Sequence, residues 1–242
     1  SRWMKKVYFH LFERKLLEKT SKIHLLGKTE LEGLHRIFPN EKSFLLPYGF
    51  DLQQNYNHLL PYQSGFVIGF MGRLDIYTKG LDLLINAFGN FQKTNLNSQL
   101  WILGDGKGRS FLENAIREKQ LQNVIFWGKK FGKEKEELLG KMHVFAHPSR
   151  NEGLPSSVLE VAALGIPSVV THATNIAEYI QNYDAGIAIE NDSEQELLHA
   201  FEKIKKLYDT QNTSHFSSNN IKMLQEVFAW DILVDEYDKL YN

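Results

Sequence analysis

The stretch FVIGFMGRLDIYTKGLDLLINAFGNF, residues 66–91, joins a short apolar run, a polar loop and an amphipathic segment. The run 66–72 has the length and the β-rich composition of a buried strand. The apolar residues of the third part recur at helical spacing, at Leu81, Leu84, Ile85, Phe88 and Phe91. A strand followed by a helix that packs back on it is the repeating unit of a parallel α/β sheet.

Five further apolar runs are each followed by a segment with helical character. These runs are residues 99–104, 123–128, 143–148, 167–171 and 186–190. The alternation predicts an α/β fold with a doubly wound, parallel, six-stranded, Rossmann-like sheet. Such sheets bind their ligands at the carboxyl ends of the strands, in the loops that lead into the helices. We therefore look for functional residues in those loops.

The remaining segments predict additional pieces around this sheet. Residues 1–46 predict an incomplete αβαβ piece with no sheet of its own, which we interpret as the remnant of another domain. Residues 47–65, with Pro, Gly and Asn, are expected to link it to the main domain, 66–226. Residues 227–242 are expected to form a terminal helix.

The composition is that of an ordinary soluble globular protein. The chain has 242 residues, 43% of them hydrophobic, and 28 basic against 29 acidic residues give a net charge of -1. This balance argues against a nucleic-acid partner, so any anion site must be local. The absence of cysteine excludes disulfides and thiolate metal sites, and a cytoplasmic location is the simplest expectation. No apolar run approaches the roughly 18 residues of a membrane span.

The loop after the first strand of the main domain carries two cations. Arg73 and Lys79 precede a helix that opens at Gly80. A phosphate placed there would meet both charges and the positive end of the helix. The alternative is that both are solvated loop residues, because Lys and Arg are mostly exposed in proteins.

Three glycines follow the second strand, at positions 104, 106 and 108. A dinucleotide fingerprint requires G-x-G-x-x-G after a first strand, whereas this segment is G-x-G-x-G after a second one. We therefore expect a tight, ligand-facing turn and no nicotinamide cofactor.

The sequence also lacks the common metal and hydrolase motifs. His143 and His147 are four positions apart, but their segment predicts a strand, so they do not form a helical zinc pair. Neither H-E-x-x-H nor D-x-D occurs, and no metal or cofactor is expected. Without G-x-S-x-G, a common α/β serine hydrolase is disfavoured.

The stretch HPSRNEGLPSSVLEVAALG, residues 147–165, contains two carboxylates. A helix is expected to start at Ser156 or Ser157, after Pro155, and to stop before a C-terminal glycine. Ser157 and Glu160 have the S-x-x-E spacing of a capping box. Alternatively, the free amides at the helix start face a ligand, and Glu160 accepts hydrogen bonds from its hydroxyls. Glu152, in the preceding loop, and Glu160 could also form a glycosidase carboxylate pair.

Taken together and in this order, GFMGRLDIYTKGLDLLINAF, LWILGDG, VIFWGK and VFAHPSRNEGLPSSVLEVAALGIPSVV resemble the nucleotide-sugar domain of the family 4 (group 1) glycosyltransferases, which have the GT-B fold. The resemblance covers about residues 44–242. It implies that Arg73 and Lys79 bind the donor diphosphate, as the Arg and Lys of the family's G-R-L…K-G segment do. The family's E-x7-E signature falls on Glu152 and Glu160, which enclose seven residues.

The resemblance also implies roles for the carboxylates. Glu152 is expected to hold hydroxyls of the transferred sugar, together with the amides around Gly153 and Leu154. Glu160 is expected to hold the nucleotide ribose.

Two further segments correspond to known positions in the family, one after the third strand and one after the fifth. The segment near Lys129 and Lys130 corresponds to where the family contacts the base, mostly through the backbone. The loop after the fifth strand departs from the family, because Asn175 and Ala177 stand where Gly and Pro usually precede the glutamate, here Glu178.

The activity implied is a retaining, metal-independent transfer from a UDP-, GDP- or ADP-sugar to a sugar, lipid-linked or glycan acceptor. Arg73, Lys79 and Glu152 are the expected catalytic residues, with the two cations stabilising the leaving diphosphate. The alternatives are a GT-B epimerase or phosphorylase and a non-catalytic nucleotide-binding module.

By the same resemblance, residues 1–43 are the end of the acceptor-binding domain, and the terminal helix crosses back to it. We expect the chain alone to bind its donor weakly and to transfer little. The full-length protein is expected in the cytoplasm, with a peripheral position at the inner membrane face as an open alternative. The oligomeric state is left open.

Overall fold

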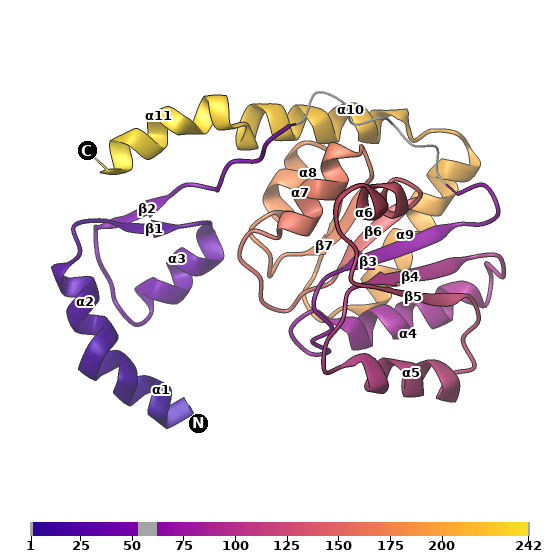
Figure 1. The fold of residues 1–242 in the computed structure, drawn as a ribbon, viewed down its shortest axis with the longest axis horizontal. Helices are drawn as coiled ribbons and strands as arrows, with labels where there is room; N and C mark the ends of the chain where they lie inside the picture. Colours follow the sequence, from indigo (N-terminus) through magenta and orange to yellow (C-terminus); the bar gives the residue numbers. More distant parts are fainter. Residues whose placement is uncertain (1, 53–61, 242) are drawn as a thin grey trace.

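A parallel six-stranded sheet forms the centre of the larger part of the protein, in the order β5-β4-β3-β6-β7-β8 (Figure 1). The computed structural model describes residues 2–52 and 62–241. The strands are β3 (Val67–Met71), β4 (Gln99–Leu103), β5 (Val124–Gly128), β6 (Val144–His147), β7 (Ser168–Thr171) and β8 (Gly186–Ile189). Each lies within one of the six apolar runs, so the predicted doubly wound sheet is confirmed.

Helices cover both faces of this sheet. One face carries α4 (Leu81–Gln92), α5 (Arg109–Glu118) and α9 (Glu194–Asp209). The other carries α6 (Gly132–Leu139), α7 (Ser156–Ala163), α8 (Ala177–Asn182) and α10 (Ser214–Met223). Because successive strand residues point to opposite faces, Val67 packs in the core under α7 while Ile68 packs in the core under α4.

The order of the strands reverses once. From β3 the chain moves outward through β4 to β5, and it then returns to the other side of β3 to form β6. The loops that follow β3 and β6 therefore leave neighbouring strands in opposite directions. Such a switch point opens a crevice at the carboxyl ends of the two strands, where α/β proteins bind their ligands.

The N-terminal piece has a small sheet of its own. Its elements are α1 (Arg2–Tyr8), the π-helical η1 (Phe9–Glu13), α2 (Arg14–Lys19), β1 (Ile23–Leu25), α3 (Lys28–His35) and β2 (Ser43–Leu45). β1 and β2 pair in parallel, with Ile23 opposite Ser43. The expectation that these strands have no sheet of their own was therefore wrong. Each strand satisfies part of the other's backbone, which an unpaired strand could not do.

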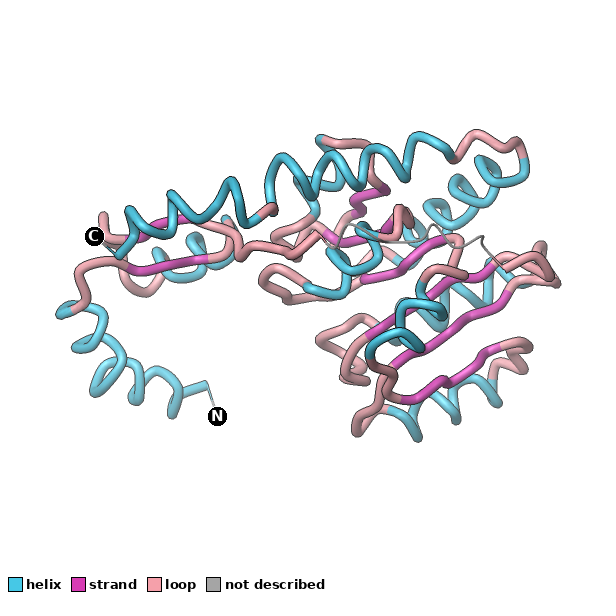
Figure 2. Tube along the Cα trace, turned by 45° about the horizontal axis from the view of Figure 1, so that its top comes forward, coloured by secondary structure: helices cyan, strands magenta, loops and turns pink. Residues whose placement is uncertain are grey.

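The end of the chain returns to this N-terminal piece. After α10 come a second π-helical segment, η2 (Leu224–Phe228), and α11 (Trp230–Tyr241), which runs alongside β1 and β2 (Figure 2). Lys22 Nζ donates to the Lys239 carbonyl at 2.6 Å, and the Tyr237 hydroxyl donates to the Pro47 carbonyl at 3.2 Å.

Two of the expected segments, the linker and the terminal helix, can be compared with the structure only in part or differ from it. Of the predicted linker 47–65, residues 53–61 lie outside the described residues. The boundary expected between residues 226 and 227 falls inside η2. None of the helices in the described part of the chain combines the length and the apolar character that crossing a membrane requires.

Candidate functional site

The loops after β3 and β6 are bonded to each other at the switch point. The Ser149 hydroxyl and the Arg150 amide both donate to the Thr78 carbonyl, at 2.7 and 2.9 Å. At the start of α4, Gly80 has φ 63°, and a Cβ on it would stand 1.9 Å from the Pro148 carbonyl oxygen. A side chain at this position would therefore push the two loops apart, so glycine is required.

Lys79 and Glu152 face each other across these loops. Lys79 Nζ donates to Glu152 Oε2, and their side chains are only 13% and 24% exposed. The Ser149 hydroxyl, which donates to Thr78, lies 3.4 Å from the same carboxylate oxygen. His147 Nε2, at the end of β6, lies 3.5 Å from it. The structure thus brings together two of the predicted site residues, along with two that the sequence analysis did not single out as functional.

The charges of this cluster follow from its contacts. The His147 ring and the Lys79 ammonium hold the pKa of Glu152 at about 2, well below its ordinary value of 4.5, despite partial burial. Burial lowers the pKa of His147, although the adjacent Glu152 works in the other direction. At neutral pH the carboxylate is therefore ionised and accepts hydrogen bonds only, while the imidazole is uncharged.

Arg150 fixes the surroundings of this cluster. Its guanidinium donates twice to the Asp82 carboxylate, at 2.8 Å each, and also to Asp192. It lies 4.7 Å from the centre of the Tyr77 ring. The hydrogen bonds that Arg150 donates to Asp82 raise the pKa of Arg150 above its already high ordinary value. This arginine is occupied on every side, which makes it a clamp between loops and not a ligand-binding cation.

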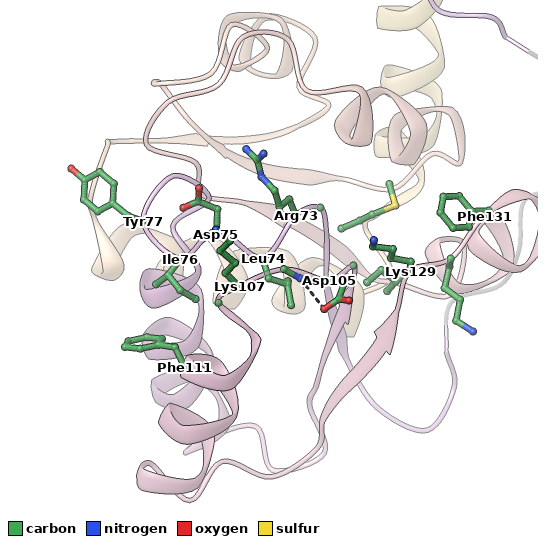
Figure 3. Close-up of a pocket in the computed structure, with 17 residues that line it drawn as sticks. Arg73, Leu74, Asp75, Ile76, Tyr77, Asp105, Lys107, Phe111, Lys129 and Phe131 are labelled. Atoms are coloured by element: carbon green, nitrogen blue, oxygen red, sulfur yellow. Dashed lines mark hydrogen bonds between the residues drawn. The ribbon is translucent and has the colours of Figure 1, made fainter. Parts of the chain in front are cut away.

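Arg73 lines a cavity of about 1210 Å³ at the carboxyl ends of β3, β4 and β5 (Figure 3). Its side chain is exposed and forms no ion pair with an acidic group in the described residues. Lys129 and Lys130, after β5, line the same cavity, and Lys130 is bound to Glu134 of α6. With Lys107, which follows β4, four cations border this cavity, and only Lys130 has an acidic partner in the described chain.

Glu160 lies on α7 and pairs with a residue of another helix. α7 begins at Ser156 with Pro155 as its N-cap, and no side chain caps it. The predicted capping box was therefore wrong. Glu160 Oε2 instead lies 2.5 Å from Lys135 Nζ of α6, an ion pair that local sequence spacing cannot reveal. Ser157 falls inside the helix, where its hydroxyl cannot cap the start.

The turn before α7 presents backbone donors. In the described residues, the amides of Gly153 and Leu154 donate to no other group. The Leu154 carbonyl is taken by the Tyr48 hydroxyl at 2.7 Å, and burial raises the pKa of that hydroxyl to about 12. The free amides lie next to Glu152 in sequence, so a polar group bound near this carboxylate would find N–H donors beside it.

The two glutamates are paired with different lysines, which does not favour the glycosidase carboxylate pair. Glu152 is paired with Lys79 and Glu160 with Lys135, so each carboxylate is committed to a different lysine. In the described residues, no group of three His, Cys, Asp or Glu side chains is arranged to hold a metal ion.

The loop that departs from the family pattern contacts the N-terminal piece. The backbone amide and the hydroxyl of Thr29 both donate to Asn175 Oδ1, at 3.0 and 2.7 Å. Lys28 Nζ lies 2.7 Å from Glu178 Oε2. A glycine in place of Asn175 would offer no acceptor here, so the departure has a structural use.

The sequence analysis missed His147, Ser149 and Arg150 as members of the site. A polar residue at the carboxyl end of an otherwise apolar strand was the available signal for His147. For the other two there was none, because their partners come from loops whose conformations the sequence does not specify.

The sequence model described as "Glycosyl transferases group 1" matches residues 54–223. This match covers more than half of the chain, and the chain therefore belongs to the group 1 glycosyl transferases. Its sheet and helices have the GT-B arrangement, since the structure superposes on the crystal structure of TarM with a TM-score of 0.81 over 93% of this chain and 44% of that one, at 20% identity.

Several other proteins are similar to this chain. The capsular polysaccharide biosynthesis glycosyltransferase CapM of Staphylococcus aureus is 27% identical over 93% of this chain and 57% of its own length. The O-antigen biosynthesis glycosyltransferase WclY of Escherichia coli is 27% identical over 68% of this chain and 43% of its own. Anabaena HepE, crystallised with UDP-glucose, superposes with a TM-score of 0.75 at 20% identity, over 91% of this chain and 63% of that one. The chain thus spans about half the length of the curated relatives it matches.

Proposed function

We propose that the protein is the donor-binding half of a retaining, metal-independent family 4 glycosyltransferase, which moves a sugar from a nucleotide-sugar to an acceptor. The observation that carries this proposal is the Lys79–Glu152 pair at the switch point. A cation and an ionised acceptor stand side by side there, next to a cavity bordered by the unpaired Arg73. A nucleotide-sugar presents phosphates and hydroxyls in adjacent positions, which need these two kinds of group.

The reaction requires stabilisation of the leaving group. When the bond between the sugar and the diphosphate breaks, negative charge develops on the diphosphate. Arg73 and Lys79 are cations on one loop, Arg73 exposed at the cavity and Lys79 largely buried, and together they stabilise this charge. No metal is needed in this role, because two lysine or arginine charges offset the charge that develops.

Glu152 binds the sugar in this proposal. As an ionised, acceptor-only group it takes hydrogen bonds from sugar hydroxyls, while the amides of Gly153 and Leu154 donate to their oxygens. Because Glu152 is assigned to the sugar hydroxyls, it is not assigned as a covalent nucleophile. Retention is therefore assigned to attack by the acceptor from the face that the diphosphate leaves.

The nucleoside lies further out in this proposal. Glu160, at 27% exposure, holds ribose hydroxyls after exchanging part of its contact with Lys135. The base lies against the backbone near Lys129 and Lys130, which line the cavity after β5. UDP-, GDP- and ADP-sugars are the candidate donors, and the complex of HepE with UDP-glucose favours testing a UDP-sugar first.

Calorimetric titration with UDP-, GDP- and ADP-glucose tests the donor site. Arg73→Ala and Lys79→Ala are expected to weaken binding of the preferred donor by about tenfold or more, the usual effect of losing a charged hydrogen bond. Lys119→Ala is the matched control, since Lys119 is an exposed cation at the end of α5, outside the cavity. Equal binding by all four proteins, or no binding by any, would contradict the donor site.

Product analysis tests the reaction itself. The chain spans about half of its relatives, and we propose that the acceptor site, for a sugar, a glycan or a lipid-linked sugar, lies mostly in a domain of which residues 1–46 are a part. Incubated with the donor and simple sugar acceptors, the 242 residues are expected to give little transfer. Efficient turnover by this chain, or isomerisation of the donor without an acceptor, would oppose the assignment.

A further inference from the structure

His147 occupies an unusual place for an imidazole. Its side chain is 1% exposed and stacks between the rings of Phe70 and Phe145, at centroid distances of 6.4 and 6.2 Å. These neighbours are apolar, and a leucine or phenylalanine would fill such a site without any polar cost. A buried polar group without a hydrogen bond destabilises a protein, because it has lost its water partners and gained none. The histidine therefore needs a reason beyond packing.

The polar neighbour of this ring is Glu152. In the described residues neither ring nitrogen has a hydrogen-bond partner, and the polar atom near Nε2 is Glu152 Oε2, at 3.5 Å. A carboxylate accepts only, so a contact between the two requires the neutral tautomer with its proton on Nε2. The charged groups that face the ring are Glu152 and, behind it, Lys79. His147 is thus placed as a second donor to a carboxylate that Lys79 already holds.

The Lys79 ammonium has two partners to bind, Glu152 and the donor diphosphate. It donates to Glu152 in the structure, and in the proposed function it also binds the donor diphosphate. A diphosphate carries more charge than one carboxylate, so its binding draws the ammonium away. Glu152 then loses its nearest cation at the moment when it must accept hydrogen bonds from the sugar.

We propose that His147 is a positioning residue, whose Nε2–H holds the Glu152 carboxylate in place and directed at the sugar hydroxyls when Lys79 turns to the diphosphate. This inference rests on the proposed function. A shift of a few tenths of an ångström turns the 3.5 Å contact into a normal hydrogen bond. Because the ring is buried beside two aromatic side chains, its movement is restricted.

The test separates binding of the sugar from binding of the nucleotide. For each variant, the Kd for UDP is divided by the Kd for UDP-glucose, and the same is done for the GDP and ADP pairs if these bind better. His147→Leu is expected to lower this ratio by about tenfold, as for loss of one hydrogen bond to a charged group, with UDP affinity changed much less. His147→Gln is expected to restore most of the ratio, because its amide places an N–H near the position of Nε2.

The matched control is His143, on the same chain segment. Its Nδ1 accepts a hydrogen bond from the Val67 amide at 3.0 Å. This bond plays no part in the proposed positioning of Glu152. His143→Leu is therefore expected to reduce stability but to leave the ratio of the two Kd values unchanged. A second measurement needs no ligand. The pKa of Glu152, followed by the NMR shift of its carboxyl carbon, is expected to rise in His147→Leu and to return toward about 2 in His147→Gln.

The outcomes distinguish failure of the positioning role from failure of the proposed function. If UDP and UDP-glucose bind and the ratio is the same in His147→Leu, or falls equally in His147→Gln, the positioning role is wrong while the donor site stands. If no nucleotide binds to the wild-type chain, the proposed function fails. In that case an unchanged Glu152 pKa in His147→Leu also refutes the contact itself.

Discussion

The carboxylate of Glu152 is ionised because the fold holds a cation and an imidazole beside it. These neighbours stabilise the folded protein only while the carboxylate is ionised. Its folded-state pKa of about 2 lies below the ordinary value of 4.5. The unfolded chain therefore binds this proton more readily than the folded one. The corresponding stabilisation is complete above pH 4.5 and is lost as the pH falls toward 2.

Urea unfolding of the wild type and Glu152→Gln between pH 2.5 and 7 measures this contribution. At pH 7 the wild type is expected to be more stable by about 2 kcal/mol, a figure that allows for partial solvent screening. The advantage should shrink as the pH is lowered below 4.5, because protonation removes the charge from wild-type Glu152 as well. A difference that is constant with pH would show that the carboxylate is not specifically stabilised.

A second prediction concerns the glycine where the two loops touch. Gly80→Ala places a methyl group against the Pro148 carbonyl and forces an alanine into a left-handed conformation. We expect a loss of at least about 2 kcal/mol in the free energy of unfolding, measured by denaturant titration. Gly33→Ala is the control. Gly33 lies in α3 with open space around it, and the change there should be neutral or stabilising by up to about 1 kcal/mol.

At the scale of elements, Arg150 joins parts of the chain that pack on different strands. It connects the β6–α7 loop to the first turn of α4, through Asp82, and to the β8–α9 loop, through Asp192. Its side chain is 11% exposed, so its partners would be left in a poorly hydrated place without it. The clamp therefore holds the loops that carry Lys79 and Glu152.

Removal of this clamp should be costly. Arg150→Ala is expected to destabilise the protein by about 3 kcal/mol, and Arg150→Lys should recover less than half of this because a lysine cannot bond both Asp82 oxygens in parallel. Thermal unfolding followed by circular dichroism gives the comparison. Lys205→Ala breaks the pair with Asp209 within α9, and we expect at most about 0.5 kcal/mol there. Similar losses for Arg150→Ala and Lys205→Ala would contradict the clamp.

Periodicity within one segment allowed the elements to be predicted, and contacts between segments are what it could not provide. The spacing of Leu81, Leu84 and Phe88 identified α4, because each helix or strand buries its own apolar face. The capping box failed because Pro155 occupies the cap and Lys135, from another helix, offers Glu160 a full charge.

The candidate site was predicted in part for the same reason. The positions of Arg73, Lys79, Glu152 and Glu160 on loops and on α7 were predicted from motif order. The pairing of Lys79 with Glu152, and the closeness of His147 to Glu152, depend on the reversal of strand order that makes β6 a neighbour of β3. No local pattern encodes that neighbourhood.

At the scale of the whole molecule, the N-terminal piece is attached to the larger part by contacts of unequal strength. The bonds from Thr29 to Asn175 are partly buried, and Asn175 itself is 8% exposed. The Lys28–Glu178 pair is more than half exposed at both side chains. Exposed pairs contribute little to stability, so the first contact should dominate.

Hydrogen exchange checks this ranking. Asn175→Ala is expected to speed exchange of the Thr29 amide about tenfold or more, because its acceptor is lost, and to loosen α3 around it. Lys28→Ala is the matched variant one residue away and should change the same amide by less than about twofold. Faster exchange in the lysine variant than in the asparagine variant would reverse the assignment.

The chain crosses twice between the N-terminal piece and the larger part, and the two crossing segments lie together at one point. The Phe50 amide donates to the Phe228 carbonyl at 2.6 Å, and Phe50 pairs with Ala229 where η2 gives way to α11. A body connected through two adjacent crossings has fewer degrees of freedom than one hung on a single linker, because twisting about the chain axis is blocked. Bending about an axis near Phe50 and Ala229 keeps this bonded point intact, but it strains the Thr29–Asn175 bonds. Such a bend would also move Glu30 of the N-terminal piece relative to Gly153, which lies beside it on the loop that carries Glu152.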